Sequence, residues 1–167
     1  MHTPVIIRQG TKADLEAILS LIRELALFER MPDAVTVTLE SMEKDGFGEN
    51  PIYTAHVAEV DGIIVGMAIF FTYYSTWKGK CIYLEDLIVK EAWRRKSIGR
   101  KLFDSVAAYS AEVHANLLKW QVLDWNVNAI EFYNTYDSTI DKGEWLNGRL
   151  TKEQLAEFRH RPIFTEL

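Results

Sequence analysis

The chain has 167 residues, of which 48% are hydrophobic and 26% are charged, and its formal net charge is −5. This length and composition are typical of one folded domain spanning 1–167, and they exclude a disordered chain. No apolar run approaches the roughly 18 residues of a membrane-spanning helix, and the first residues lead directly into a strand pattern rather than a leader. Cys81 is the lone cysteine, which excludes an internal disulfide. We therefore expect a cytoplasmic protein with no membrane partner.

Acidic side chains are concentrated in one early segment. Residues 14–49 hold nine acids and three bases. A segment of this kind attracts cations and repels nucleic acid, which argues against a nucleic-acid partner. A solvated helix face explains the acids equally well when charge alone is considered.

Hydrophobic periodicity predicts strands and helices in alternation. Thr11 with Asp14 is typical of a helix N-terminus, and apolar residues follow at helical spacing. Asp61-Gly62 between two strand patterns indicates a two-residue hairpin. In chain order we expect strand 5–8, a helix after residue 11, helix 39–44 ended by Asp45-Gly46, and strands 53–60, 63–74 and 82–89. We then expect helix 98–116, buried strand 118–123, helix 127–136, strand 144–150 and a helix over 151–159, at whose start Thr151 and Gln154 form a capping box. This order predicts an α/β (α+β) fold with an antiparallel middle, not a doubly wound parallel sheet.

A basic cluster follows the strand predicted at 82–89. It comprises Arg94, Arg95 and Lys96, and the small residues Ser97 and Gly99 follow at the start of the next helix. Free backbone N–H groups and the positive end of the helix dipole favour an anion at such a position, so the segment is a candidate polyphosphate site. Taken alone the pattern is weak, and a basic solvated turn is the alternative.

Two adjacent carboxylates, Glu85 and Asp86, lie within the same strand. Neighbouring side chains of a strand point to opposite faces unless a bulge intervenes. A solvated or salt-bridged pair is the commoner fate of strand acids. The apolar flanks IYL and LIV argue against that fate, because burying a carboxylate is costly.

Six motifs together carry a resemblance to a known family. They are LIRELALFE at 21–29, DGFGENP at 45–51, STWKGKCIYLED at 75–86, RRKSIGRKLF at 94–103, VLDWNVNAIEFY at 122–133 and GEW at 143–145. In this order they resemble the GNAT N-acetyltransferases, and within them the diamine (spermidine/spermine) acetyltransferase family. STWKGK and VLDWN are closer to the thialysine acetyltransferase branch. The resemblance implies a mixed, mostly antiparallel twisted sheet flanked by helices, and a homodimer. It also implies acetyl transfer from acetyl-CoA to a primary amine, by direct attack in a ternary complex.

The resemblance also implies which residues bind acetyl-CoA. Main-chain groups of Leu87, Ile88 and Val89 would bind the pantetheine arm, with Asn126, Asn128 and Ala129 opening the next helix beneath it. The pyrophosphate would be held by Arg94, Arg95, Lys96, Ser97, Ile98, Gly99 and Arg100. Ser97 replaces the first glycine of the family pattern, where glycine lets the backbone approach the anion.

Catalytic and acceptor-binding roles follow from the same resemblance. Tyr133 would protonate the departing thiolate, and Glu85 would assist deprotonation of the amine through a water. Phe28, Glu29, Trp77, Glu85 and Asp86 would bind the acceptor. Solvation of the helix end is the alternative for Phe28 and Glu29, and a hydrophobic plug is the alternative for Trp77. A helix tyrosine packed on the sheet is the alternative for Tyr133. The family has basic residues and a glycine soon after this tyrosine, whereas this chain has Asn134-Thr135-Tyr136-Asp137.

The remaining signals limit the choice of function. His2, His56, His114 and His160 have no metal-like spacing, and one cysteine cannot form a zinc site, so no metal is expected. The expected acceptor is a small cationic amine: thialysine, a lysine-like amine, or a di- or polyamine. The alternatives are an acetyltransferase for proteins or peptides, and a module that binds acetyl-CoA without turnover. Ser97 and the altered segment after Tyr133 are the only support for the binding module.

Overall fold

The computed structural model describes residues 4–141, 143, 151, 154 and 156. These residues belong to two compact units, Met1–Gln121 and Val122–Leu167, and each unit is described by itself. The strand predicted at 144–150, and with it most of the GEW motif, lies outside the described residues, as does most of the final helix. Thr151 N–H donates to Gln154 Oε1 at 2.8 Å, and Gln154 N–H donates to Thr151 Oγ1 at 3.3 Å. The capping box predicted for that helix is therefore present.

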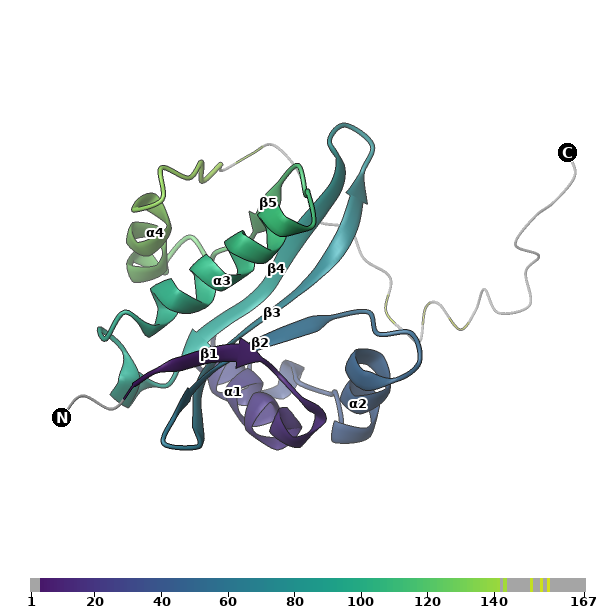
Figure 1. The fold of residues 1–167 in the computed structure, drawn as a ribbon, viewed down its shortest axis with the longest axis vertical. Coiled ribbons are helices and arrows are strands. Elements are labelled where there is room, and N and C mark those ends of the chain that lie inside the picture. Colours follow the sequence, from purple (N-terminus) through teal and green to yellow (C-terminus); the bar gives the residue numbers. More distant parts are fainter. Residues whose placement is uncertain (1–3, 142, 144–150, 152–153, 155, 157–167) are drawn as a thin grey trace, which may run out of the picture. The chain divides into compact units, whose positions relative to one another are not determined.

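A five-stranded sheet forms the centre of the first unit (Figure 1). Its strands are β1 (Ile6–Gln9), β2 (Thr54–Val60), β3 (Ile63–Ser75), β4 (Gly79–Val89) and β5 (Leu118–Trp120), and they lie side by side in that order. The first four pair antiparallel, and β5 pairs parallel to β4. The predicted mixed, mostly antiparallel sheet is confirmed. Asp61 and Gly62 both have positive φ angles, of 50° and 77°, as the two-residue hairpin requires.

Helices cover both faces of this sheet (Figure 1). Helices α1 (Leu15–Phe28) and α2 (Leu39–Phe47) lie on one face, and α3 (Ile98–Glu112) lies on the other. Short 3-10 turns at Lys12–Asp14, Pro32–Ala34 and Glu91–Trp93 complete the unit. The core on the α1 side joins Ile18 and Leu21 of the helix to Met67 of β3. Among the helices that the structure describes, none combines the length and apolar character needed to cross a bilayer.

Gly66 allows α3 to pack closely on the other face of the sheet. A Cβ at this position would lie 2.9 Å from the carbonyl oxygen of Ile88 and 3.1 Å from Leu102 Cδ1. Glycine thus lets Leu102, which is fully buried, rest directly on β3 and β4. The start of α3 is thereby held against the end of β4, where the predicted site residues lie.

Several predicted boundaries are wrong, including those of α2, α3 and β5. Helix α2 continues past Asp45-Gly46 to Phe47. A Cβ at Gly46 would lie 2.3 Å from the ring of Tyr53, so this glycine makes room for packing and does not end the helix. Helix α3 ends at Glu112 rather than near residue 116, and His114 follows with a left-handed φ of 55°. Strand β5 has three residues, none of them buried, although a buried strand was predicted.

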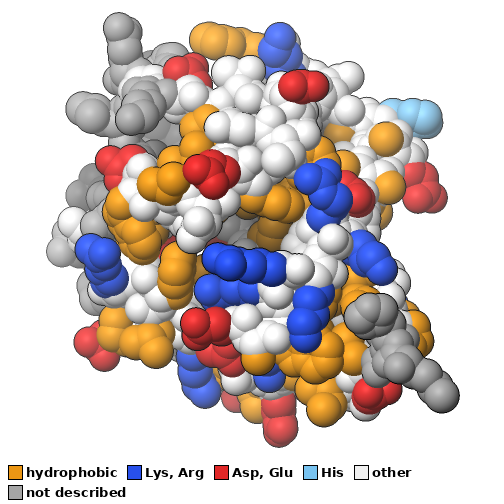
Figure 2. Space-filling view, turned by 90° about the vertical axis from the view of Figure 1, so that its left-hand side faces the viewer, with side chains coloured by type: hydrophobic (Ala, Val, Ile, Leu, Met, Phe, Trp, Pro, Cys, Tyr) orange, Lys and Arg blue, Asp and Glu red, His pale blue; other side chains and the backbone are white. Residues whose placement is uncertain are grey.

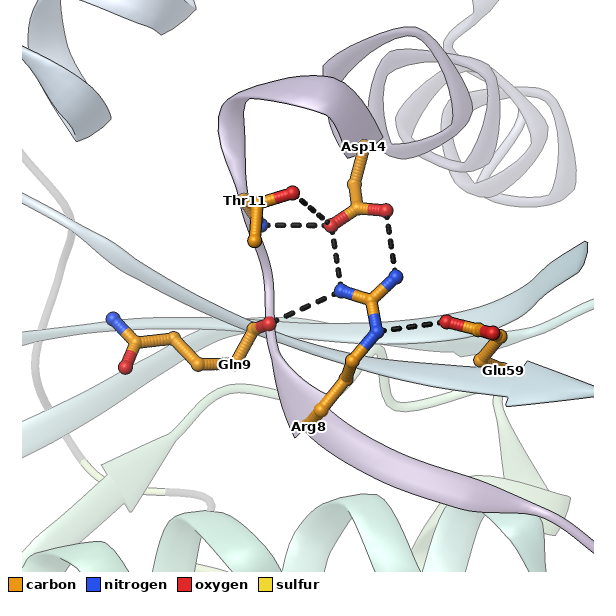
Figure 3. A network of polar contacts seen from close by, with 5 residues as sticks. All are labelled: Arg8, Gln9, Thr11, Asp14 and Glu59. Carbon is orange, nitrogen blue, oxygen red and sulfur yellow. Dashed lines mark hydrogen bonds and ion pairs between the residues drawn. The ribbon is translucent and has the colours of Figure 1, made fainter. Parts of the chain in front are cut away.

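Arg8 connects β1, β2 and the start of α1 (Figure 3). Its guanidinium donates two hydrogen bonds to Asp14, at 2.7 and 2.8 Å, and Nε donates to Glu59 at 2.7 Å. The backbone N–H and hydroxyl of Thr11 also donate to Asp14, at 2.7 and 2.9 Å. The bonds from Arg8, followed by those from Thr11, hold the pKa of Asp14 well below its ordinary value of 3.8.

We predict that Asp14→Asn lowers the free energy of unfolding by about 2–4 kcal/mol at pH 7, because Arg8 loses the charge of one of its two carboxylate partners. A depressed carboxyl pKa stabilises the fold above the unfolded value and ceases to do so as pH falls through the folded value. Wild-type stability should therefore fall more steeply below pH 4 than that of the variant. Urea unfolding, followed by tryptophan fluorescence at several pH values, measures the free energy of unfolding and its dependence on pH for both proteins.

The matched control is Glu43→Gln, which breaks the exposed 2.6 Å pair between Lys12 and Glu43. Such pairs contribute at most about 1 kcal/mol. An Asp14→Asn cost no larger than that of Glu43→Gln would contradict the structural role of Asp14.

Candidate active site

Glu85 is an extra residue in β4. Asp86 pairs with Ile69 and Leu84 pairs with Phe70, so no residue of β3 is left opposite Glu85. This β-bulge breaks the alternation of side chains along the strand. Paired residues share a face, so Asp86 lies with Ile69 on the side of the sheet covered by α1. Glu85 is exposed and Asp86 is half-buried.

The bulge brings three carboxylates together, from the end of α1 and from β4. We call Glu29, Glu85 and Asp86 the carboxylate cluster. Burial, and then the charges of Glu85 and Glu29, raise the pKa of Asp86 to about 6. Burial also raises the pKa of Glu29. The phenol of Tyr83 lies near the cluster, since burial and then the charges of Glu85 and Asp86 raise its pKa.

The carboxylate cluster has the properties of an ammonium site. Several negative charges attract a cation, and a carboxyl group with a pKa near 6 accepts a proton near neutral pH. Among the described residues, no group of three or more His, Cys, Asp or Glu is arranged to hold a metal ion. The sequence prediction named the three acids but missed Tyr83. Tyr83 lies two residues before Glu85 in the strand, and this spacing is the signal that would have suggested Tyr83 as part of the site.

The end of β4 presents main-chain groups at an open edge. Strand β5 pairs only with residues 82–84 of β4, so residues 85–89 have no strand partner on that side within the described chain. Lys90 N–H donates to Val65 O at 2.9 Å, so the main-chain groups of Lys90 face β3. In an antiparallel pair, every second residue directs its N–H and C=O groups to the same side. Ile88 therefore bonds to β3, while the N–H and C=O groups of Leu87 and Val89 point to the open edge.

The loop between β4 and α3 is basic and exposed. Figure 2 shows Lys and Arg side chains gathered on this side of the molecule. Arg94, Arg95, Lys96, Ser97 and Arg100 are exposed, whereas Ile98 is buried and Gly99 is half-buried. The side chain of Ser97 makes no capping hydrogen bond to α3. The N–H groups of the first turn of α3 are therefore not capped by Ser97, as an anion site requires.

Two residues of this loop have left-handed backbone conformations. The φ angles of Arg95 and Ser97 are 59° and 60°. This conformation costs a residue other than glycine about 1–2 kcal/mol. Ser97 therefore has the left-handed conformation that glycine adopts most easily, which accounts for the glycine at this position of the resembled pattern. Serine keeps this conformation at an energetic cost.

Helix α4 (Val127–Asn134) carries the remaining predicted residues in the second unit. Asn126 caps this helix, with its Oδ1 accepting a hydrogen bond from Ala129 N–H at 3.2 Å. Asn128 is exposed. Tyr133 is only 7% exposed, and its ring centroid lies 5.1 Å from that of Phe132. Its carbonyl oxygen accepts a hydrogen bond from the hydroxyl of Ser138 at 2.8 Å.

Phe28 directly precedes an acid of the carboxylate cluster, whereas Trp77 lies far from the cluster. Phe28 ends α1 directly before Glu29, and the guanidinium carbon of Arg94 lies 5.7 Å from the centre of its ring. Trp77 lies in the turn between β3 and β4 and is 83% exposed. That turn is about 20 Å along β4 from Asp86 at the usual rise per residue. The structure therefore does not bring Trp77 to the carboxylate cluster.

A separate hollow contains none of the predicted site residues. Its volume is about 440 Å³, and it is lined by Gln9, Gly46, Pro51, Ile52, Tyr53, Thr54, Phe71, Thr72 and Tyr109. No lining side chain is charged, so this hollow lacks the groups that a polyphosphate or an ammonium ion needs.

The chain matches a family model described as the acetyltransferase (GNAT) family over residues 15–136. The chain belongs to this family. Acetyltransferases of this family use acetyl-CoA as the acetyl donor. The predicted fold, the predicted enzyme class and the predicted donor are therefore confirmed.

Curated relatives support the resemblance to diamine acetyltransferases. A thialysine N-epsilon-acetyltransferase of Sus scrofa is 37% identical over 164 residues, which cover 92% of this chain and 96% of the relative. The enzyme of the same name from Bos taurus is 40% identical, covering 77% and 81%. The spermidine/spermine N(1)-acetyltransferase-like protein 1 of Homo sapiens is 32% identical over 90% of this chain but only 23% of its own length.

Solved structures agree on the fold. An aminoglycoside acetyltransferase from an uncultured soil metagenomic sample superposes with a TM-score of 0.74 at 21% identity, over 89% of this chain and 97% of that one. An aminoglycoside N-acetyltransferase in complex with CoA gives a TM-score of 0.70 at 16% identity, over 90% and 98%. At these identities the likeness establishes the fold alone.

The raised pKa of Asp86 predicts that this residue destabilises the fold at neutral pH. A carboxyl group whose pKa is raised on folding favours the folded state most at low pH, and that contribution is lost as pH rises through the folded value of about 6. We expect Asp86→Asn to raise the free energy of unfolding by about 1–2 kcal/mol at pH 8 and to leave it nearly unchanged at pH 4. Urea unfolding at the two pH values tests this.

Asp61→Asn, in the β2–β3 hairpin, is the control for removing one negative charge from an exposed position. It should show no such pH dependence. If Asp86→Asn is equally stable relative to wild type at both pH values, the burial and charge crowding inferred for Asp86 are wrong.

Proposed function

We propose that this chain is an acetyl-CoA-dependent N-acetyltransferase that acetylates the primary amine of a small cationic acceptor. The observation that carries the proposal is the carboxylate cluster at the β4 bulge. Two of its three acids, Glu85 and Asp86, lie on the same strand as the open main-chain edge, just before the basic loop. One strand thus offers features suited to a cation and, next to them, features suited to a polyphosphate carrier.

The carboxylate cluster prepares the acceptor. Glu29 and Asp86 attract the ammonium group, and their partial burial strengthens that attraction over its value in water. Glu85, exposed at the bulge, takes a proton from the ammonium through a water molecule, which leaves the neutral amine needed for attack. Asp86 binds the acceptor beside it, and its pKa of about 6 keeps it largely ionised at neutral pH.

The other residues hold the donor and complete the transfer. Acetyl-CoA supplies an activated thioester. The loop 94–100 holds its pyrophosphate, and Leu87 and Val89 bond to its pantetheine amides through their main chains. The resemblance to the family adds Asn126, Asn128 and Ala129 to the residues that bind the donor. A C–N bond forms as the C–S bond breaks, and Tyr133 gives the leaving sulfur its proton. The acetylated nitrogen loses its surplus proton to solvent, which also reprotonates Tyr133. Transfer is direct within a ternary complex, so positioning of the two substrates supplies much of the acceleration.

The acceptor class follows from charge and from the relatives. A cluster of three acids suits an acceptor with more than one amine, or an amine on an otherwise cationic molecule. Thialysine acetyltransferases are relatives that match most of this chain, so thialysine, a lysine-like amine or a di- or polyamine is the proposed acceptor. Resemblance to the family supports a cytoplasmic homodimer. Trp77 is about 20 Å along β4 from the cluster of its own chain, so it is not an acceptor contact in this proposal.

Release of free thiol from acetyl-CoA across a panel of amines tests the function. The panel should hold thialysine, lysine, ornithine, spermidine, a short diamine and a lysine-containing peptide. Mass spectrometry should find a mono-acetylated small amine, and the peptide should be inactive. Preference for the peptide would favour a protein acetyltransferase. CoA binding by calorimetry without turnover of any amine would favour a binding module.

We predict that Tyr133→Phe lowers kcat about 100-fold while changing the Kd for CoA less than twofold, because a general acid acts on the transition state and not on the bound donor. Thiol release and calorimetry measure the two quantities. Tyr136→Phe, three residues along the same segment, is the matched control and should keep near wild-type turnover. Full activity in Tyr133→Phe would remove Tyr133 from the mechanism.

A further inference from the structure

The ring of Phe28 lies against a cation of the donor loop. Phe28 is the last residue of α1 and directly precedes Glu29 of the carboxylate cluster. The guanidinium carbon of Arg94 lies 5.7 Å from the centre of its ring, which is within the range of a cation–π contact. The end of the helix that carries an acceptor acid therefore contacts the first residue of the pyrophosphate loop.

Arg94 is bound on a second side as well. Its Nε donates a hydrogen bond to Val89 O at 2.9 Å. Val89 is the last residue of β4, and its main-chain groups point to the open edge. Arg94 thus joins three elements: the end of α1, the end of β4 and the loop that leads into α3.

The loop needs such anchors because its backbone is strained. Arg95 and Ser97 both have left-handed φ angles without being glycine. Such conformations persist where surrounding contacts hold them. Lys96 provides one contact, with its Nζ lying 4.6 Å from the centre of the Trp93 ring. Arg94 provides two more, its hydrogen bond to Val89 O and its contact with the Phe28 ring, and the contact with Phe28 reaches outside the loop to α1.

We propose that Phe28 is a positioning residue for the donor loop, acting through Arg94, and not only an acceptor contact. The ring holds Arg94, and Arg94 holds the loop in the shape that receives the pyrophosphate. The acceptor end of α1 and the donor site are then energetically coupled, so that binding at one site affects affinity at the other. This inference rests on the proposed use of the loop to bind the pyrophosphate of acetyl-CoA.

Calorimetry with CoA alone, in the absence of any amine, tests the proposal. Without an acceptor present, a role of Phe28 in amine binding cannot change the result. We expect Phe28→Leu to weaken CoA binding about two- to fivefold, the effect of losing one exposed cation–π contact. Phe28→Tyr keeps a ring and should bind CoA as the wild type does. Leu27→Ala, at the neighbouring exposed position, is the control and should have no effect.

A double-mutant cycle with Arg94→Gln shows whether the two residues act together. If they do, Phe28→Leu adds no further loss of CoA affinity in the Arg94→Gln background. Thermal unfolding of each variant identifies a general loss of folding. Phe28→Met, which also lacks a ring and should weaken CoA binding to the same extent, tests the proposal if Phe28→Leu does not fold. Wild-type affinity in Phe28→Leu, or additive losses in the cycle, would overturn the inference and leave the proposed function intact. Failure of the wild type to bind CoA would overturn both.

Discussion

Strand β4 holds one residue more than the stretch of β3 with which it pairs. The position of this extra residue, Glu85, decides which way each later residue of β4 directs its side chain and its main-chain groups. Before Glu85, the ladder directs the main-chain groups of Ile82 toward β5. After Glu85, the same direction is taken by Leu87 and Val89. A regular strand would have directed Ile88 outward instead, and it would have placed Asp86 on the face covered by α3. That face is filled by apolar side chains such as Leu102 and Val106, where a carboxylate would be buried without a partner.

The site combines features that each oppose folding. Three carboxylates crowd together, one of them with its pKa raised to about 6, and two loop residues adopt left-handed backbone conformations. Functional sites commonly contain strain of this kind, held by the surrounding structure. Here the surrounding structure includes the Arg8–Asp14–Glu59 network, which fixes the start of α1 to β1 and β2. The other end of the same helix carries Phe28 and Glu29. The network therefore holds α1 in place, and with it Phe28 and Glu29 at the acceptor end of the site.

The sequence predicted those parts of the molecule that depend on local chemistry. The Asp61-Gly62 hairpin, the capping box of Thr151 and the order of the described elements follow from neighbouring residues. The face of Asp86 does not, because the bulge at Glu85 depends on pairing with Ile69 and Phe70, more than ten residues away in the chain. Gly46 was misinterpreted for the same reason, since the ring that requires a glycine there belongs to Tyr53. The contact between Phe28 and Arg94 joins two motifs that the sequence named separately but gave no reason to connect.

The two departures from the family pattern alter side chains more than the backbone. Ser97 replaces a glycine, yet it takes the left-handed φ of 60° that a glycine would supply. After Tyr133, where the resemblance leads us to expect a glycine, this chain has Asp137 with a left-handed φ of 51°. Asp is among the residues that tolerate this region best. The backbone amides of the loop therefore keep an arrangement suited to an anion, and the turn after α4 forms without glycine. These two departures were the only support for a module that binds acetyl-CoA without turnover, and the backbone conformations at both positions weaken that support in favour of an active transferase.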